Sequence, residues 1–88
     1  MAHGMISGHV RDRNGRPLAL ARVYVVSGPG AFPDVAALTD EQGAFTLPAS
    51  GAGTYTIESS LEGFASAQTT VQLAGDGEAR VEISLPPG

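Results

Sequence analysis

The chain has 88 residues, no cysteine, and a net charge of −4 that arises from nine acidic residues against five arginines, with no lysine. A chain of this length forms one domain and buries only about 60–65% of its unfolded surface, so every element has to contribute to a single core. This composition excludes disulfides, zinc–thiolate sites and cysteine nucleophiles, and the acidic balance argues against nucleic acid as a partner. The longest apolar stretch, residues 18–26, is broken by Arg22 and is too short to span a bilayer, so no membrane insertion is expected.

The first two expected elements are strands on either side of a turn. Apolar and polar residues alternate over residues 6–11 and again over residues 21–26, which is the period of a half-buried strand. Between them, the segment 12–17 combines aspartate, asparagine, glycine and proline and predicts a hairpin turn. Gly8 is expected to let the opposite sheet approach. The residues expected to face the core are Ile6, Gly8, Val10, Ala21, Val23 and Val25.

A loop rich in glycine and proline over residues 27–34 leads to a short third strand, expected over residues 35–39. The segment 39–43 again joins acidic residues to a glycine and predicts a second hairpin turn. A fourth strand is expected over residues 44–47. Pro48 is expected to end it, because proline cannot donate a hydrogen bond to a neighbouring strand.

Three more strands complete the chain. The fifth, over residues 54–62, alternates without a slip, and a shift by one residue would bury two glutamates. The sixth ends near Leu73, and the seventh spans residues 79–85 after a glycine-rich turn. The side chains expected to face the core are Tyr55, Ile57, Ser59, Leu61, Thr69, Val71, Leu73, Ala79, Val81, Ile83 and Leu85. The Tyr55 hydroxyl is expected to reach a polar partner at the rim of the core.

Seven short strands with no sustained helical period predict an all-β fold, a seven-stranded antiparallel Greek-key β-sandwich. Successive connections in such a sandwich alternate between its two ends, and the two termini leave from opposite poles. One pole is expected to gather the turns at residues 12–16, 40–43 and 62–63. The other is expected to gather the connections at residues 27–34, 48–53 and 74–78.

Several segments keep the residue types and order of a known family. They are Ile6-Ser7-Gly8-His9-Val10, Asp12 with Gly15 and Pro17-Leu18, Ala21-Arg22-Val23, Thr39-Asp40 with Gly43 and Phe45, Gly53-Thr54-Tyr55-Thr56-Ile57, and Gly63-Phe64. In this order the chain resembles the carboxypeptidase regulatory-like domain over residues 5–85. The resemblance implies a prealbumin-like fold, similar to transthyretin, in a domain that sits beside catalytic, receptor or adhesive domains. It brings no catalytic residue with it.

The resemblance also sets expectations for context. It implies an extracellular or cell-surface location, with neighbouring domains of a longer chain, or another protein, as partners. Residues 1–4 are expected to be a remnant left by expression or a linker, and residues 86–88 a linker or tail.

Catalytic groups are sparse in this sequence. His3 lies near the N-terminus and His9 on the outward face of the first strand, and neither has a partner that the sequence reveals. A serine nucleophile would need a positioned base, and a zinc site would need three or four converging ligands. The sequence therefore predicts no enzyme and no cofactor.

Turn residues offer candidates for a calcium site. Asp12, Asn14, Asp40, Glu41 and Glu62 fall in the turns expected at one pole, and their oxygens are the ligand type that Ca²⁺ takes. Their spacing matches no calcium loop, and aspartate and asparagine also form turns unaided. Turn formation is the favoured interpretation, and calcium binding is the alternative.

Two aromatic residues are candidates for partner binding. Phe32 lies on the longest loop, where it either anchors a partner or folds back over the core, and Tyr24 lies on an outward strand face with Val26 and Leu38. The first hypothesis is a noncatalytic accessory or interaction module of a larger secreted or surface protein. The alternatives are a carbohydrate- or calcium-binding module and a transthyretin-like domain that self-associates through an exposed edge strand.

Overall fold

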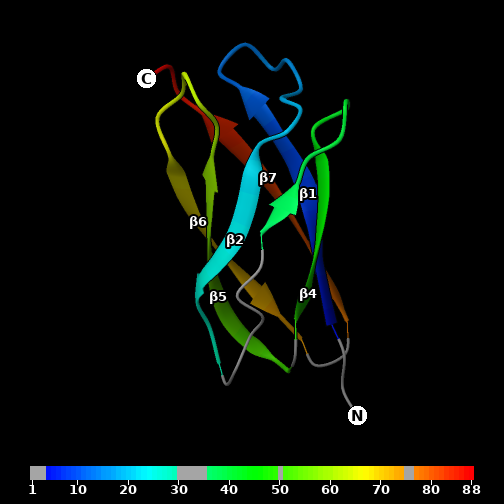
Figure 1. Cartoon of the computed structure of the whole chain (residues 1–88). Coiled ribbons are helices and arrows are strands. Elements are labelled where there is room, and N and C mark those ends of the chain that lie inside the picture. Colours follow the sequence, from blue (N-terminus) through cyan, green and yellow to red (C-terminus); the bar gives the residue numbers. More distant parts are fainter. Residues whose placement is uncertain (1–3, 30–35, 50, 75–76) are drawn as a thin grey trace.

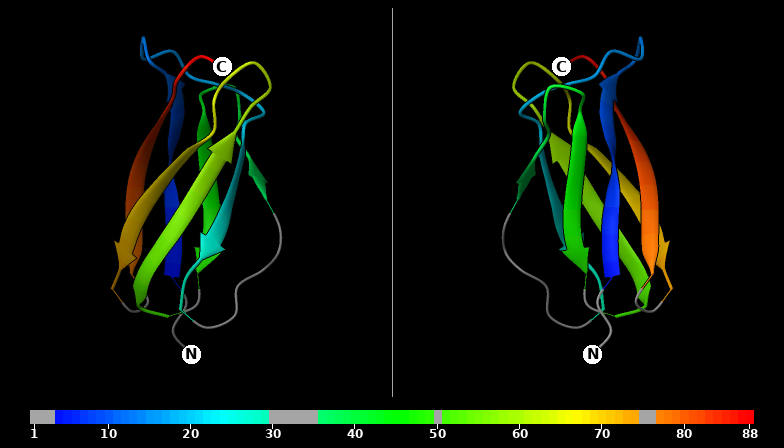
Figure 2. Two further views of the ribbon diagram at one scale, coloured as in Figure 1. Left: turned by 90° about the vertical axis from the view of Figure 1, so that its left-hand side faces the viewer. Right: turned by 90° about the vertical axis from the view of Figure 1, so that its right-hand side faces the viewer.

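Seven strands in two layers build the domain (Figures 1 and 2). The computed structural model describes residues 4–29, 36–49, 51–74 and 77–88, and in these ranges no helix is long and apolar enough to cross a membrane. The strands are β1 (Gly4–Asp12), β2 (Arg22–Ser27), β3 (Ala37–Leu38), β4 (Ala44–Ala49), β5 (Gly53–Ser60), β6 (Ala67–Leu73) and β7 (Glu78–Leu85). One sheet has the order β4-β1-β7 and the other β3-β2-β5-β6. The all-β class and the two-sheet sandwich are confirmed.

One strand pair departs from the antiparallel expectation. β1 pairs with β4 in antiparallel orientation but with β7 in parallel, with Gly8 opposite Val81. Successive strands cross the sandwich in alternating directions, so two odd-numbered strands run the same way. When the topology places β1 and β7 side by side, their ladder has to be parallel.

The alternation expected from the sequence sets the core. In β7 every second residue is buried, and the core of Ile6, Val10, Val23 and Ile57 is completely shielded from solvent. Tyr55 is 1% exposed, and its hydroxyl donates a hydrogen bond of 2.8 Å to the carbonyl of Gly51, as the sequence led us to expect.

Strand boundaries differ from expectation at several places. The third strand, expected over residues 35–39, is limited to Ala37–Leu38. β4 continues through Pro48 to Ala49, with Pro48 opposite Met5. β4 is the edge strand of its sheet and has a neighbour on one side only. Proline is tolerated at such an edge because its backbone lacks an N–H group and no strand on the open side needs one. β5 ends at Ser60, so Leu61 lies beyond the strand and is only half-buried.

Both aspartate–glycine segments reverse the chain by the same local geometry. Oδ1 of Asp12 accepts the backbone N–H groups of Asn14 (2.8 Å) and Arg16 (2.9 Å). Asp40 makes the same two bonds, at 2.8 and 2.9 Å, to the residues two and four positions further on. The hairpin expectation is wrong in one respect: each turn leads from a strand of one sheet to a strand of the other. Both therefore act as crossings between layers.

The hydroxyl of Ser59 lacks a partner in the core. Ser59 is fully buried on β5, and its Oγ makes no hydrogen bond. Burial of an unsatisfied hydroxyl is unfavourable, so Ser59→Ala is expected to raise the free energy of unfolding by about 1 kcal/mol. Urea denaturation measures this change, with Ser7→Ala on the outward face of β1 as the control, which should be nearly neutral. A loss of stability in Ser59→Ala would contradict the expectation.

Candidate interaction surface

The expected gathering of turns at one pole is confirmed. The turns after β1, β3 and β5 lie together near the C-terminus, and β1 begins at the opposite end (Figures 1 and 2). The candidate Phe32 falls within residues 30–35, which lie outside the described residues.

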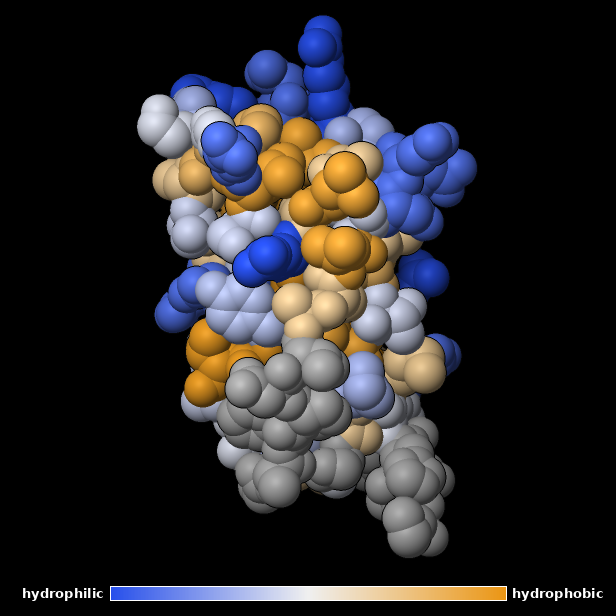
Figure 3. Space-filling model, viewed as in Figure 1, coloured by the Kyte–Doolittle hydropathy of each residue, from blue (hydrophilic) through white to orange (hydrophobic). Residues whose placement is uncertain are grey.

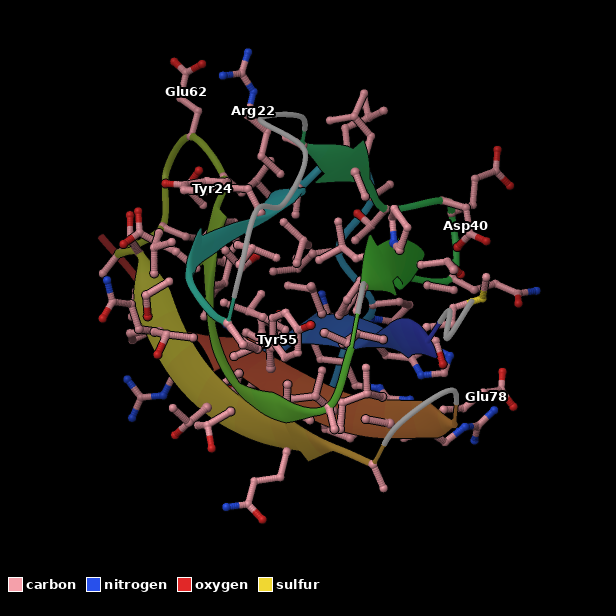
Figure 4. All side chains as sticks on the ribbon, turned by 90° about the horizontal axis from the view of Figure 1, so that it is seen from below. Arg22, Tyr24, Asp40, Tyr55, Glu62 and Glu78 are labelled. Atoms are coloured by element: carbon pink, nitrogen blue, oxygen red, sulfur yellow. The ribbon has the colours of Figure 1, made fainter. Side chains whose placement is uncertain are left out.

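The calcium candidates share a pole but do not converge. Asp12 and Asp40 each direct a carboxylate oxygen to the backbone of its own turn. Asn14, Glu41 and Glu62 are exposed, and Figure 4 shows Asp40 and Glu62 pointing outward on different sides of the domain. Across the described part of the chain, no three His, Cys, Asp or Glu side chains are grouped to hold a metal. Hydrogen bonds within the turns account for the positions of Asp12 and Asp40.

Two carboxylates on the surface are stabilised in their ionised form. Hydrogen bonds from the backbone of Ala44 and Gln42 hold the pKa of Asp40 below its usual value of 3.8. Hydrogen bonds from the side chains of Tyr24 and Gln68 hold the pKa of Glu58 below 4.5. The favourable contribution of each group is present above its unfolded pKa and is lost as the pH falls through its folded pKa.

Unfolding free energy is accordingly expected to fall when the pH drops from 5 to about 2. Thermal melts across this range measure the effect, and Glu58→Gln, which cannot ionise, should show a shallower dependence on pH. An unfolding temperature that is constant or rises on acidification would contradict this linkage.

A polar ladder crosses the outer face of the four-stranded sheet. Tyr24, Glu58 and Gln68 are register partners on β2, β5 and β6. The Tyr24 hydroxyl donates to Oε2 of Glu58, and Nε2 of Gln68 donates to Oε1 at 2.8 Å. The hydrogen bond to Glu58 raises the pKa of Tyr24. Tyr24 is half-buried with its hydroxyl already bonded, so its place on this face is set by the ladder.

An apolar knob and a groove lie beside this ladder, toward the C-terminal pole. Leu20 is 68% exposed and Leu38 59% exposed, and apolar side chains gather over β2 and β3 in Figure 3. A groove of about 380 Å³ runs next to them. Its lining residues are Leu20, Arg22, Ser60, Leu61 and Glu62. We call Leu20 with this groove the Leu20 surface.

Leu20 is held in an unusual conformation. Its φ of 63° lies in the left-handed region, the only such value among the described residues other than glycine. A branched side chain there costs about 1–3 kcal/mol. Thr39 imposes the conformation: its carbonyl accepts the N–H of Leu20 at 3.0 Å, while its Oγ1 accepts the N–H of Ala21 at 2.9 Å and donates to the carbonyl of Leu18 at 2.5 Å.

Opposite charges flank the groove. Arg22 lies between Leu38 and Ser60 in the strand register, and Glu62 follows β5. Figure 4 shows the Arg22 and Glu62 side chains reaching outward close to each other. Neither takes part in an ion pair within the described part of the chain. The sequence had singled out Tyr24 and Leu38 on this face but not Leu20, because its exposure depends on hydrogen bonds to a residue far along the chain.

The outer face of the other sheet carries an exposed charged cluster. His9 points outward as expected, and its Nδ1 lies 3.3 Å from Oε2 of Glu82, which also pairs with Arg11. These residues join β1 to β7 across their parallel ladder. The hydrogen bond of His9 to Glu82 links the two strands, and no nucleophile takes part in the contact.

Known proteins share both the sequence pattern and the fold. The sequence model of the carboxypeptidase regulatory-like domain matches residues 5–86. No curated protein matches the chain significantly.

Solved structures reproduce nearly the whole chain at low identity. A type II cohesin–X–dockerin complex from Acetivibrio cellulolyticus superposes with a TM-score of 0.72 and 21% identity, covering 97% of this chain and 58% of that chain. A hydroxyquinol 1,2-dioxygenase from Pseudomonas putida superposes with a TM-score of 0.75 and 11% identity, covering 99% of this chain and 57% of that chain. A streptococcal ancillary pilin superposes with a TM-score of 0.70 and 14% identity, covering 99% of this chain and 33% of that chain. At these identities the likeness establishes the fold, and this chain spans little more than half the length of the first two matches.

Proposed function

The chain belongs to the carboxypeptidase regulatory-like domain family, and from this premise we propose that it is a noncatalytic accessory module of a larger secreted or cell-surface protein. In this role residues 5–85 form one rigid sandwich that spaces and orients the domains on either side, with residues 1–4 and 86–88 as the joining segments. The neighbouring domains are its principal partners.

One observation carries this proposal: the chain enters and leaves at opposite poles of an elongated domain. The Cα positions extend over 38 × 19 × 18 Å, and β1 begins at one end while the C-terminus lies at the other (Figure 1). The exit is tied to the sandwich, since Ala65 donates to the carbonyl of Pro86 at 2.9 Å and Gly88 to that of Gly63 at 3.2 Å. A domain attached there would be held at a defined position.

The polar contacts of the described residues support a structural role. Asp12 and Asp40 close turns, Glu58 joins three strands, and Glu82 joins two. Nucleophilic catalysis requires a nucleophile, a base and an orienting group within hydrogen-bond reach, and these contacts do not supply that arrangement.

To test this proposal, the domain would be expressed together with the segments encoded on either side of it. Small-angle X-ray scattering would then determine the shape of this longer chain. We expect the neighbours at opposite ends, separated by roughly the 38 Å length of the domain. Neighbours that contact each other directly, or a gene that encodes no adjoining domain, would refute the proposal.

Ligand titration tests the rival function. The isolated domain would be titrated with CaCl₂ and with neutral oligosaccharides while backbone NMR shifts are followed. We expect no saturable shift. Saturable shifts at Asp12 or Asp40 would instead favour a calcium- or carbohydrate-binding module.

A further inference from the structure

We propose that the Leu20 surface is self-complementary and that two copies of this chain pair side by side through it. This contact goes beyond the spacing role, which uses the poles of the domain, because it joins separate chains along their flanks.

The knob of this contact is Leu20. Most exposed apolar residues need no explanation, but this one combines 68% exposure with a backbone conformation that disfavours a leucine. Glycine or asparagine would occupy the position without that strain and would expose no apolar surface. Thr39 holds the residue there through four hydrogen bonds to residues 18–21. The fold thus presents a large apolar side chain where local preference opposes it.

The hole is the adjacent groove. Leu61 and Ser60 line it from β5 and the residue that follows, Glu62 extends it toward the turn, and its volume of about 380 Å³ admits a branched aliphatic side chain. Leu20 itself forms part of the lining, so knob and hole lie next to each other on one surface. A two-fold axis between them places Leu20 of each copy in the groove of the other, as an isologous contact requires.

Charge complementarity favours a second copy as the occupant. The net charge of −4 opposes association of two chains in general, but the Leu20 surface carries one positive and one negative side chain, Arg22 and Glu62, on the lining of the same groove. In a two-fold arrangement Arg22 of one copy faces Glu62 of the other, twice over. Both side chains are free of ion pairs among the described residues, so pairing breaks no existing salt bridge.

The first test measures the mass of the chain by sedimentation equilibrium from micromolar to millimolar concentration. We expect a reversible monomer–dimer equilibrium. Leu20→Gly removes the knob and relieves the backbone strain, so the variant should stay folded while dimer affinity falls at least about tenfold, as for an interface anchor. Met5→Ala, which truncates an exposed apolar residue on the other sheet, should leave the dimer unchanged.

The second test exchanges charges. Arg22→Glu should weaken the dimer, and the double variant Arg22→Glu/Glu62→Arg should restore it. Adding Glu41→Arg to Arg22→Glu, which makes the same net change at an exposed site of another turn, should not restore it.

Three results would overturn the pairing: a strictly monomeric mass at millimolar concentration, a dimer that Leu20→Gly leaves intact, or a charge exchange that fails to restore affinity. A monomer that binds an adjoining domain of its own polypeptide through Leu20 would assign the Leu20 surface to that domain instead. Since the scattering experiment on the longer chain does not depend on dimer formation, the spacing role and the pairing can fail separately.

Discussion

Thr39→Val is expected to lower the free energy of unfolding by about 2–4 kcal/mol. Thr39 is 2% exposed, and its Oγ1 satisfies two backbone groups, the N–H of Ala21 and the carbonyl of Leu18. Valine has nearly the same shape, so packing is preserved while both groups lose their partner. Each unsatisfied buried group costs about 1–3 kcal/mol, so replacing this one hydroxyl with a methyl group lowers the free energy of unfolding substantially. Urea denaturation of both proteins measures it.

Thr39→Ser separates the hydrogen bonds from the packing. Serine keeps the hydroxyl and removes one methyl group, so its cost is expected near 1 kcal/mol. If the Thr39→Val and Thr39→Ser variants are destabilised equally, the hydroxyl of Thr39 does not hold residues 18–21 in place. The valine variant also tests the link to the Leu20 surface, since release of residues 18–21 should weaken dimer formation as strongly as Leu20→Gly does.

Gly8→Ala is expected to destabilise the domain by about 3 kcal/mol or more. Gly8 lies on β1, the central strand of its sheet, and a Cβ atom there would lie 1.7 Å from the carbonyl oxygen of Val81. The obstacle is the backbone of β7, which side-chain rotation cannot relieve. β1 and β7 would have to separate along their parallel ladder, which holds the centre of the three-stranded sheet together.

The matched control is Ser7→Ala on the same strand. Ser7 points to the outward face, and its truncation is expected to change stability by less than about 0.5 kcal/mol. A Gly8→Ala variant as stable as the Ser7 control would mean that the two strands can separate without loss. Gly8 was expected to admit the opposite sheet; the close neighbour is instead β7 of the same sheet.

The inward faces of the strands were predictable because burial has a period of two along each strand. Tyr55, Ile57 and Ser59 are buried as this period requires, and so is every second residue of β7. The turns at Asp12 and Asp40 were predictable because their hydrogen bonds span at most four residues. Pro48 was misjudged because its effect depends on whether a strand lies at an edge, which is a property of the sheet order.

The candidate site was less accessible to sequence reasoning. Placing the turns at one pole followed from strand parity, but the directions of Asp40 and Glu62 depend on which sheet each segment borders. Leu20 was not singled out, since a leucine in an apolar run reads as a core residue. Its exposure depends on the hydrogen bonds that Thr39 makes to residues 18–21.

Local information in the sequence therefore determined the strands, their buried faces and their turns, because alternation and turn chemistry act between residues a few positions apart. Tertiary structure alone decided the parallel pairing of β1 with β7, the close approach at Gly8 and the exposure of Leu20. Each of these depends on contacts between residues distant in the chain, where many pairings satisfy the same local pattern and only the assembled layers select one.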